Sequence, residues 1–573
     1  MPFGTFDRDE NLTALDDGTF DVLVVGGGIT GAGVALDAAS RGLRTALVER
    51  DDFASGTSSK SSKLVHGGLR YLQNGDVMLV YESLRERQRL LRNAPHLVKV
   101  LPFLIPVFAG RSGIIPRRVA RALGSAMWMY DLTGGLRIGK VHKRLGRDAA
   151  LAHMPTLDER LAWAYLYYDA QADDARLTLA VARTAALDHG ATVVNHAAVT
   201  RLLTEGDRVA GAVVDAGDRE IRVRARAVVN ATGVWADEVS ALDDASQPRT
   251  LRPAKGIHIT VPWHKVRNDI AAVVPVPSDR RSVFVVPWPG PESPGGADGP
   301  GGPHGESAFT YIGTTDTEYE GDLDDPQCTA DDVAYLLAAM NQSLREPLAE
   351  TDVIGTWAGL RPLVNEGTGD RTADRTADLS RRHRISTSPG GMVTVTGGKL
   401  TTYREMAQDA VDAAVALLDD PLPRRARRSR TARLPLRGAE GWDDAHEHDP
   451  HLAGRYGGEA AVLRAMVTAD TTLGEPIAPG LPYRRVEALY AARYEMATTL
   501  DDVLSRRLRA RLLARDTAAA AADDVARLVG QELGWDERER TAQVEAFRAS
   551  VERERQVPGL PRTDPLALSH DAP

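Results

Sequence analysis

Residues 21–50 read DVLVVGGGITGAGVALDAASRGLRTALVER, and this stretch decides the fold. The β-branched apolar run at residues 22–25 predicts a strand that is buried on both faces. Three glycines follow at once in the spacing Gly26-x-Gly28-x-x-Gly31, and the small residues after them continue a helical pattern. Residues 44–48 predict a second strand. Strand, glycines, helix and strand in this order predict an α/β domain that binds a dinucleotide.

Each part of the stretch has a role in such a site. Gly26 allows a tight turn, Gly28 lets backbone amides approach a diphosphate, and Gly31 lets the helix pack closely on the strand. The diphosphate would lie at the positive end of the helix dipole. Glu49, about 20 residues on, is placed to accept the two hydroxyls of a ribose. An acid at this position also disfavours NADP, which carries a 2′-phosphate.

Composition limits the class of protein. A chain of 573 residues is too long for one core, so we expect two or three domains. Its 43% hydrophobic and 26% charged residues are typical of a soluble globular protein. The net charge of −9 argues against a nucleic-acid partner. Cys328 is the sole cysteine, which excludes a disulfide framework and a Cys-ligated zinc site, and we expect no metal.

The sequence also bears on location. The acidic N-terminal residues 1–18 have no apolar core and do not resemble a signal peptide. No run approaches about 18 apolar residues, so we expect a cytoplasmic protein with no transmembrane helix. Residues 111–147 combine basic side chains with Trp and Met, which suits an interfacial helix on a membrane surface. The alternative is a helix that buries its apolar stripe inside the protein. The basic residues are Arg117, Arg118, Arg121, Arg137, Lys140, Lys143, Arg144 and Arg147.

Further motifs follow in order along the chain. A loop rich in Ser and Gly at residues 55–63 lies just beyond the second predicted strand, where its hydroxyls can line a ligand. Residues 77–93 and 329–345 predict helices, and residues 223–235 predict a strand that ends in a glycine-containing turn. Residues 392–404, MVTVTGGKLTTYR, predict a strand, a double glycine and a second anion-ready helix N-terminus.

These motifs together resemble one family. The strings SSKLVHGGLRYL, DDARL, NATGVW, KGIHITV, IGTTD, GLRPL and GGKLTTYR occur in family order, and YEMATTLDDVLSRR matches the C-terminal part. The chain resembles the FAD-dependent, quinone-linked glycerol-3-phosphate dehydrogenases. The main departure is the Pro- and Gly-rich stretch at residues 289–305, which we expect to be a disordered loop.

The resemblance implies an α/β fold with an FAD-binding Rossmann-like domain of the D-amino-acid-oxidase-like (glutathione-reductase-2) type. An antiparallel-sheet substrate domain is interleaved with it, and an all-helical domain follows. The expected ranges are 18–420 for the FAD-dependent region (FAD-binding segments 18–105, 170–240 and 350–420; substrate segments 106–169 and 241–349), 421–437 for a basic linker, 438–557 for the helical domain and 558–573 for a disordered tail.

The resemblance also implies an activity. The expected reaction is oxidation of sn-glycerol 3-phosphate to dihydroxyacetone phosphate, with hydride transfer from C2 to FAD and electrons passed to quinone. The expected assembly is a homodimer, with peripheral association at the inner face of the cell membrane. One alternative is a glycerophosphate oxidase that uses oxygen. Others are a flavoprotein with another substrate and a non-catalytic flavin-binding protein.

Residue roles can be carried onto the matching motifs. A phosphate monoester is best matched by planar guanidinium groups, so the expected phosphate ligands are Arg70, Tyr71, Arg361 and Arg381, with Arg382 as an alternative to Arg381. Oxidation of an alcohol also needs a base, and histidine suits that role. His258 is the first choice and His66 the second. Lys399 is expected to orient the substrate or stabilise charge on the flavin.

The expected cofactor residues come from the same motifs and from the dinucleotide pattern. Val199 would act through its backbone, on the adenine side. The full expected set is Gly26, Gly28, Gly31, Glu49, Thr57, Ser58, Ser62, Val199, Gly233, Trp235, Gly398, Lys399, Leu400 and Thr401.

Overall fold

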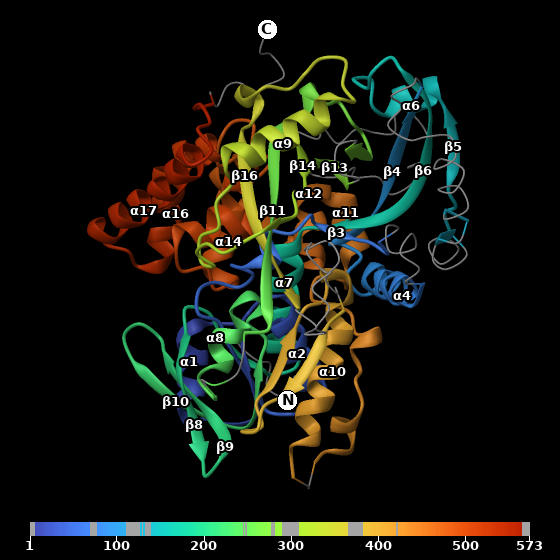
Figure 1. Ribbon diagram of the computed structural model, residues 1–573. Coiled ribbons are helices and arrows are strands. Elements are labelled where there is room, and N and C mark those ends of the chain that lie inside the picture. Colours follow the sequence, from blue (N-terminus) through green and yellow to red (C-terminus); the bar gives the residue numbers. More distant parts are fainter. Residues whose placement is uncertain are drawn as a thin grey trace.

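The computed structural model describes residues 6–68, 77–109, 127–128, 130–131, 139–244, 246, 249–276, 281–288, 309–364, 382–419 and 422–563. Two sheets organise these residues, and Figure 1 shows them in the lower and upper parts of the molecule. A group of helices from the C-terminal part of the chain lies beside both.

The lower sheet is the predicted dinucleotide-binding sheet. Its strands run in the order β17-β18-β10-β1-β2-β7, and those from β18 to β7 are parallel. Antiparallel β8 and β9 extend it from β10. The strands are β1 Thr19–Val25, β2 Thr45–Val48, β7 Thr192–Val194, β8 Ala198–Glu205, β9 Arg208–Asp215, β10 Glu220–Asn230, β17 Arg384–Thr387 and β18 Val393–Thr396.

Small residues let helices pack closely on this sheet. Helix α2 (Ile29–Ser40) contacts α7 (Asp174–Arg183) on one side and α10 (Tyr403–Ala416) on the other. A Cβ atom at Gly33 would lie 2.8 Å from the Tyr403 ring, so only glycine fits at this helix crossing. Packing of α2 against α10 therefore requires a glycine at this position.

The upper sheet is antiparallel over most of its width. Its main path is β15-β11-β14-β13-β12-β4-β6-β3, with β16 paired to β11 and β5 to β6. Only the β12–β4 pair within it is parallel among the described strands. The strands are β3 Leu64–Val65, β4 Val98–Phe108, β5 Lys143–Gly146, β6 Leu161–Ala172, β11 Leu251–Pro262, β12 Ala271–Val276, β13 Arg281–Trp288, β14 Phe309–Gly313, β15 Thr317–Glu318 and β16 Gly355–Val364.

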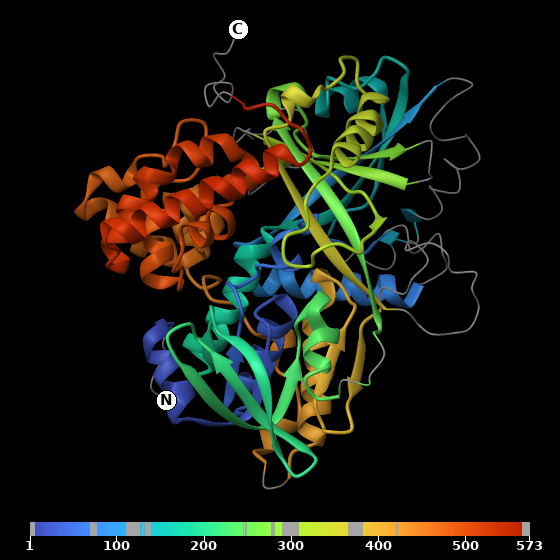
Figure 2. The same ribbon diagram turned by 60° about the vertical axis from the view of Figure 1, so that its left-hand side comes forward.

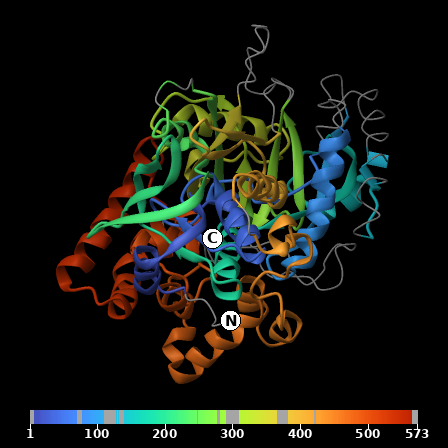
Figure 3. The same cartoon turned by 90° about the horizontal axis from the view of Figure 1, so that it is seen from below.

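The C-terminal helices form the third part of the molecule. Figures 2 and 3 show them, in orange to red, gathered along one side. They share a hydrophobic core with the upper sheet, because Leu504, Val525 and Phe547 belong to the same buried cluster as Phe103 and Tyr311. The longer helices are α13 Ala460–Ala469, α14 Arg485–Tyr494, α16 Arg515–Leu533 and α17 Glu537–Gln556. Between α14 and α16 lie two shorter elements, η13 Asp502–Arg507 and α15 Ala510–Leu513.

Two predicted helices have clear counterparts in the structure. The helix predicted at residues 77–93 is α4 (Val77–Asn93). The helix predicted at residues 329–345 is α9 (Ala330–Asn341), which is shorter. It ends early because the Asn341 side chain both donates to and accepts from the backbone of Leu348, which turns the chain.

Within the basic stretch at residues 111–147, residues 143–146 form a strand instead of the expected helix, whereas the described residues 127, 128 and 130 are helical. Lys143–Gly146 is strand β5, paired with β6, and the Arg144 guanidinium lies 4.3 Å from the centre of the Trp163 ring. Arg117, Arg118, Arg121 and Arg137 lie outside the described residues, as does the predicted loop at 289–305.

The ends of the expected domains also take definite positions. In the predicted linker, Ala426 is buried and the Ser429 hydroxyl donates to Asp37 on α2. In the predicted tail, Leu560 is buried and Thr563 contacts Asp516, while residues after 563 lie outside the description. None of the described helices is both long enough and apolar enough to cross a membrane.

Candidate active site

A cavity of about 560 Å³ lies where the parallel strands end. Val25, Val48 and Val395 line it from the carboxyl ends of β1, β2 and β18, together with Ala231 just after β10. This edge of a parallel sheet is where ligands bind in α/β folds. Every expected cofactor residue except Gly31 lines the cavity.

The glycines at this edge leave room that other residues would fill. Gly26 has φ +107°, and a Cβ atom there would lie 2.8 Å from the carbonyl oxygen of Ala231. Gly31 does not line the cavity, because it packs against the turn: its Cβ would lie 1.9 Å from the Gly26 oxygen. Gly28 caps α2 without a side chain. The turn can therefore bring backbone amides close to a diphosphate, and the cavity fits a dinucleotide.

Glu49 follows β2 and is buried. Its carboxylate accepts from the backbone N–H of Gly27 at 2.5 Å and from that of Asp51 at 2.9 Å. Burial raises the pKa of Glu49 to about 7 against the opposing effect of these hydrogen bonds. The acid therefore lines the cavity at the end of β2, and its pKa lies near neutral pH.

The loop at residues 55–63 connects the cavity to both sheets. The Ser58 hydroxyl accepts from the N–H of Ile29 at 2.9 Å, which fixes the loop to the start of α2. The Thr57 hydroxyl donates to the carbonyl of Leu360 on β16 at 2.5 Å. The Ser62 hydroxyl lies 2.9 Å from Nε2 of His258 on β11. This loop therefore lies between the nucleotide side and the upper sheet.

The remaining cofactor candidates line the cavity from other directions. Trp235 follows β10, and its indole N–H donates to Asp324 at 2.8 Å. Gly398 has φ +87° in the turn after β18, and Lys399, Leu400 and Thr401 lead from it into α10. Val199 on β8 and Gly233 also line the cavity.

His258 is 2% exposed and stacks on Trp357, with ring centres 4.7 Å apart and planes 9° apart. Burial, followed by the positive charges of Lys63 and Arg361, lowers the pKa of His258 well below its usual range. Its Nδ1 has no hydrogen-bond partner among the described residues. The imidazole is therefore neutral near pH 7 and able to accept a proton.

Arg361 lies on the same face of the sheet as His258. In the β11–β16 register His258 is opposite Trp357 and Ala254 is opposite Arg361, and positions two or four apart share a face. Gly256 between them gives the guanidinium its space, since a Cβ there would lie 2.5 Å from Arg361 Nη2. The guanidinium lies 3.1 Å from Asp316 Oδ1 and also lines the cavity.

The other expected substrate residues divide into two groups. His66 lines the cavity, and its backbone N–H donates to the Thr401 hydroxyl at 3.1 Å. Arg70, Tyr71 and Arg381 lie outside the described residues, so their expected roles rest on the motifs alone. Arg382 is described and does not line the cavity.

Comparisons with known proteins agree with this geometry. The family described as "FAD dependent oxidoreductase" matches residues 21–404, and that described as "C-terminal domain of alpha-glycerophosphate oxidase" matches residues 429–540. A glycerol-3-phosphate dehydrogenase of Mycobacterium tuberculosis is 40% identical over 554 residues, which cover 93% of this chain and 88% of the relative. The chain belongs to the FAD-dependent glycerol-3-phosphate dehydrogenases. Its cofactor is FAD, as predicted.

More distant dehydrogenases of the family also match. The mitochondrial glycerol-3-phosphate dehydrogenase of Homo sapiens is 36% identical, over 94% of this chain and 74% of its own. A solved structure of the Bacillus halodurans glycerol-3-phosphate dehydrogenase complexed with FAD aligns with a TM-score of 0.71. That alignment covers 95% of this chain and 97% of the other at 29% identity. The predicted fold, an α/β FAD-binding domain with an antiparallel substrate sheet and a helical C-terminal domain, is confirmed.

The sequence did not reveal the residues that hold this dehydrogenase site in place. The backbone oxygen of Thr315 and the hydroxyl of Thr314 both accept from Arg361, and Trp357 stacks on His258. Thr314 and Thr315 belong to the quoted string IGTTD, so the available signal was the motif itself. Asp174, in the string DDARL, binds the 55–63 loop instead of only starting a helix.

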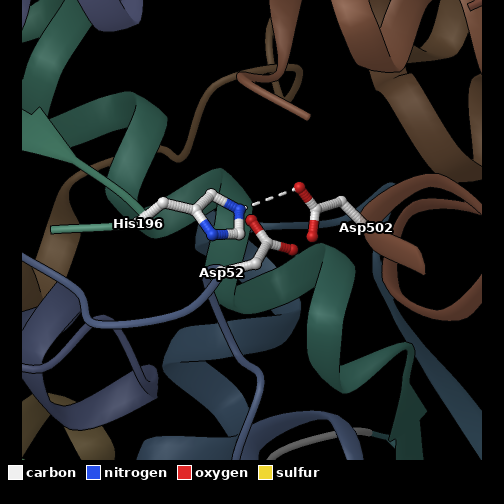
Figure 4. Close-up of side chains that lie close together, drawn as sticks. All are labelled: Asp52, His196 and Asp502. Carbon is white, nitrogen blue, oxygen red and sulfur yellow. Dashed lines mark hydrogen bonds and ion pairs between the residues drawn. The ribbon is translucent and has the colours of Figure 1, made fainter. Parts of the chain in front are cut away.

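One acidic cluster outside the cavity has the spacing of a metal site. Figure 4 shows Asp52, His196 and Asp502, whose ligand atoms lie within 4.8 Å of one another. Arginines already occupy these carboxylates: Arg506 lies 2.6 Å from Asp52 and 2.5 Å from Asp502. The carboxylate charge is thus balanced by protein cations, so the cluster joins the helical domain to the FAD-binding domain.

Proposed function

We propose that this dehydrogenase oxidises sn-glycerol 3-phosphate to dihydroxyacetone phosphate, with His258 as base and Arg361 as phosphate ligand. The observations that support these roles are the sheet face that His258 shares with Arg361 and the contact of His258 with Ser62, because Arg361 and Ser62 line the cavity. Bound FAD supplies the hydride acceptor and carries the electrons away. The residues of this chain bind the substrate, orient it and move its proton.

The proton step follows from the contacts of His258. Its Nε2 lies 2.9 Å from the Ser62 hydroxyl, and Ser62 lines the cavity. A substrate hydroxyl at C2 can therefore pass its proton to Nε2 through Ser62 as the C–H bond breaks. The low pKa of His258 keeps Nε2 free to accept that proton. His66 also lines the cavity and is the second candidate.

The charge of the substrate also favours His258 as the base and Arg361 as the phosphate ligand. A phosphate monoester carries nearly two negative charges near pH 7. The positive charge of Arg361 is one cause of the low pKa of His258, so a phosphate on Arg361 offsets that effect. The substrate anion thus raises the proton affinity of the base when the base is needed. Arg70, Tyr71 and Arg381 are proposed as further phosphate ligands from their motifs.

The electron acceptor is proposed to be quinone, reached at a membrane surface. The side chains of Met78 and Trp128 are 72% and 62% exposed, and their exposure supports contact of each with lipid. The match to the C-terminal domain of an alpha-glycerophosphate oxidase keeps oxygen as the second candidate acceptor. A homodimer and a cytoplasmic location at the inner membrane face stay predictions.

An anaerobic experiment tests this function. Glycerol 3-phosphate should bleach the visible flavin band of the purified protein. A quinone analogue in lipid vesicles should then restore the band faster than air does, and the protein should sediment with those vesicles. A band that does not bleach would overturn the substrate, and rapid recovery in air alone would favour the oxidase.

A further inference from the structure

Three arginine side chains of the helical domain contact the FAD-binding domain. Arg506 and Arg507 are the last two residues of η13, and Arg509 follows two residues later. Their guanidinium groups contact residues of the FAD-binding domain. The side chains of Arg507 and Arg509 are 2% and 1% exposed. Burying charges of this kind is costly unless their partners are well placed, so the contacts of each group matter.

The first contact is with Asp52, which precedes the loop at residues 55–63. Asp52 accepts from Arg506 at 2.6 Å and from both terminal nitrogens of Arg507 at 2.6 and 2.8 Å. Asn195 donates to the same carboxylate at 3.0 Å. Asp52 is therefore fixed between the two domains, three residues before the loop at 55–63.

The second contact is inside the loop. Arg509 donates to the backbone carbonyl of Ser59 and to Asp174 Oδ1, the latter at 2.9 Å. Asp174 in turn accepts from the Ser61 N–H at 3.0 Å and from the Ser61 hydroxyl at 2.7 Å. Lys63 also lies within 3.3 Å of this carboxylate. One guanidinium thus holds the loop both directly and through a buried aspartate.

We propose that Arg509 is a positioning residue for the active site: it holds residues 59–63 so that Ser62 meets His258. Ser62 lies between Ser61, which Asp174 holds, and Lys63, which contacts Asp174 and Ser59. The Ser62 hydroxyl lies 2.9 Å from His258 Nε2. The helical domain therefore completes the site without contributing a residue to the cavity.

The electrostatics of the loop support this role. Burial, and next the positive charge of Arg509, lower the pKa of Lys63 to about 8. Arg509 and Lys63 therefore share Asp174, and the field of Arg509 reaches a residue next to Ser62. The kinetic part of the inference rests on the proposed function, whereas the position of the loop does not.

The test compares two arginines that cross the same domain boundary. Arg509→Met removes the loop contact, and Arg183→Met removes the ion pair of Arg183 with Glu459 at 2.6 Å, which is remote from the loop. In the FAD-bound protein, amide hydrogen exchange in residues 55–63 should speed up about 10-fold in Arg509→Met and stay unchanged in Arg183→Met. This measurement needs no substrate, so it stands even if glycerol 3-phosphate fails to bleach the flavin.

The kinetic readout separates positioning from general loosening. Flavin reduction at saturating glycerol 3-phosphate should slow about 10-fold in Arg509→Met, with the substrate Kd within about twofold of the original. Arg509→Lys should recover part of the rate, because an ammonium group can reach one of the two acceptors at a time. Equal slowing in Arg183→Met, or unchanged exchange in the loop of Arg509→Met, would overturn the proposal.

If Arg509→Met does not fold, the milder variant Ser61→Ala tests the same proposal. Ser61→Ala removes the 2.7 Å bond to Asp174 at the far end of the same path. It should also speed exchange in residues 55–63, and its effect in the double variant with Arg509→Lys should be less than additive. Fully additive effects would show that the two residues act separately and would defeat the inference.

Discussion

The two ends of the cofactor cavity are built in different ways. The nucleotide end comes from one continuous stretch, in which Gly26, Gly28 and Glu49 lie on a strand, turn, helix and strand in order. The substrate end brings together His258 on β11, Arg361 on β16 and Ser62 on a loop, which are far apart in sequence. A local pattern can therefore specify the first end, whereas only the fold assembles the second.

Both ends hold a buried ionisable group whose charge is suppressed. Burial raises the pKa of Glu49 to about 7 and lowers the pKa of His258 well below its usual range. In each case the ligand supplies what favours the charged form: ribose hydroxyls can donate to Glu49, and a phosphate can offset Arg361. If the comparison is right, changes at the substrate end alter substrate binding or flavin reduction, and changes at the nucleotide end alter FAD affinity.

The largest expected effect is at the base. His258→Ala should slow flavin reduction about 10³-fold, since general base catalysis typically contributes 10²–10⁴-fold. Substrate Kd and bound FAD should change little, because Arg361 and the cavity remain. Rapid-mixing absorbance of the flavin band measures both quantities. Normal reduction in this variant, with the loss found instead in His66→Ala, would move the base to His66.

The next effect is on substrate affinity. Arg361→Ala should raise the Kd for glycerol 3-phosphate about 10²-fold, because hydrogen bonds to charged groups contribute about 1.5–3 kcal/mol each. The protein should stay yellow. Arg252→Ala is the matched control, since Arg252 lies on β11 and pairs with Glu318 at the surface. Loss of FAD from Arg361→Ala would show that Arg361 belongs to the nucleotide end.

The fold of the nucleotide end could be predicted from the sequence because the interactions that determine it are local. The existence of β1 and β2 and the tight packing at Gly31 follow from apolar runs and missing side chains, although β1 begins at Thr19, three residues before the predicted run. At the substrate end, the choice of His258 came from the motif KGIHITV. Its stacking on Trp357 and its contact with Ser62 depend on strand register and loop position, which periodicity does not encode.

The same limit explains what the sequence missed or misplaced. The string DDARL does not reveal the contacts of its second acid: Asp173 is the N-cap of α7, whereas the Asp174 carboxylate accepts from Ser61 and Arg509. Near residue 144 the basic pattern suggested a helix, yet pairing with β6 makes a strand. In both cases a partner distant in sequence decides the local structure.

The smallest effect is at the nucleotide end and depends on pH. Donation by ribose hydroxyls favours the charged carboxylate, so FAD binding should lower the pKa of Glu49 from about 7 and release a proton below that pH. With a pKa of about 7, about one tenth of Glu49 in the FAD-free protein should be ionised at pH 6 and about nine tenths at pH 8. FAD should therefore bind about 10-fold more weakly at pH 6 than at pH 8, as measured by quenching of flavin fluorescence on titration of the apoprotein.

Glu49→Gln makes this last prediction specific to the carboxylate. The variant should bind FAD more weakly at pH 8 and show no such change in affinity between pH 6 and 8, because an amide does not titrate in this range. Once saturated with FAD, it should be reduced by glycerol 3-phosphate at nearly the original rate, since His258 and Arg361 are untouched. A slower reduction at saturation would mean that the two ends are coupled, and the division between them would then fail.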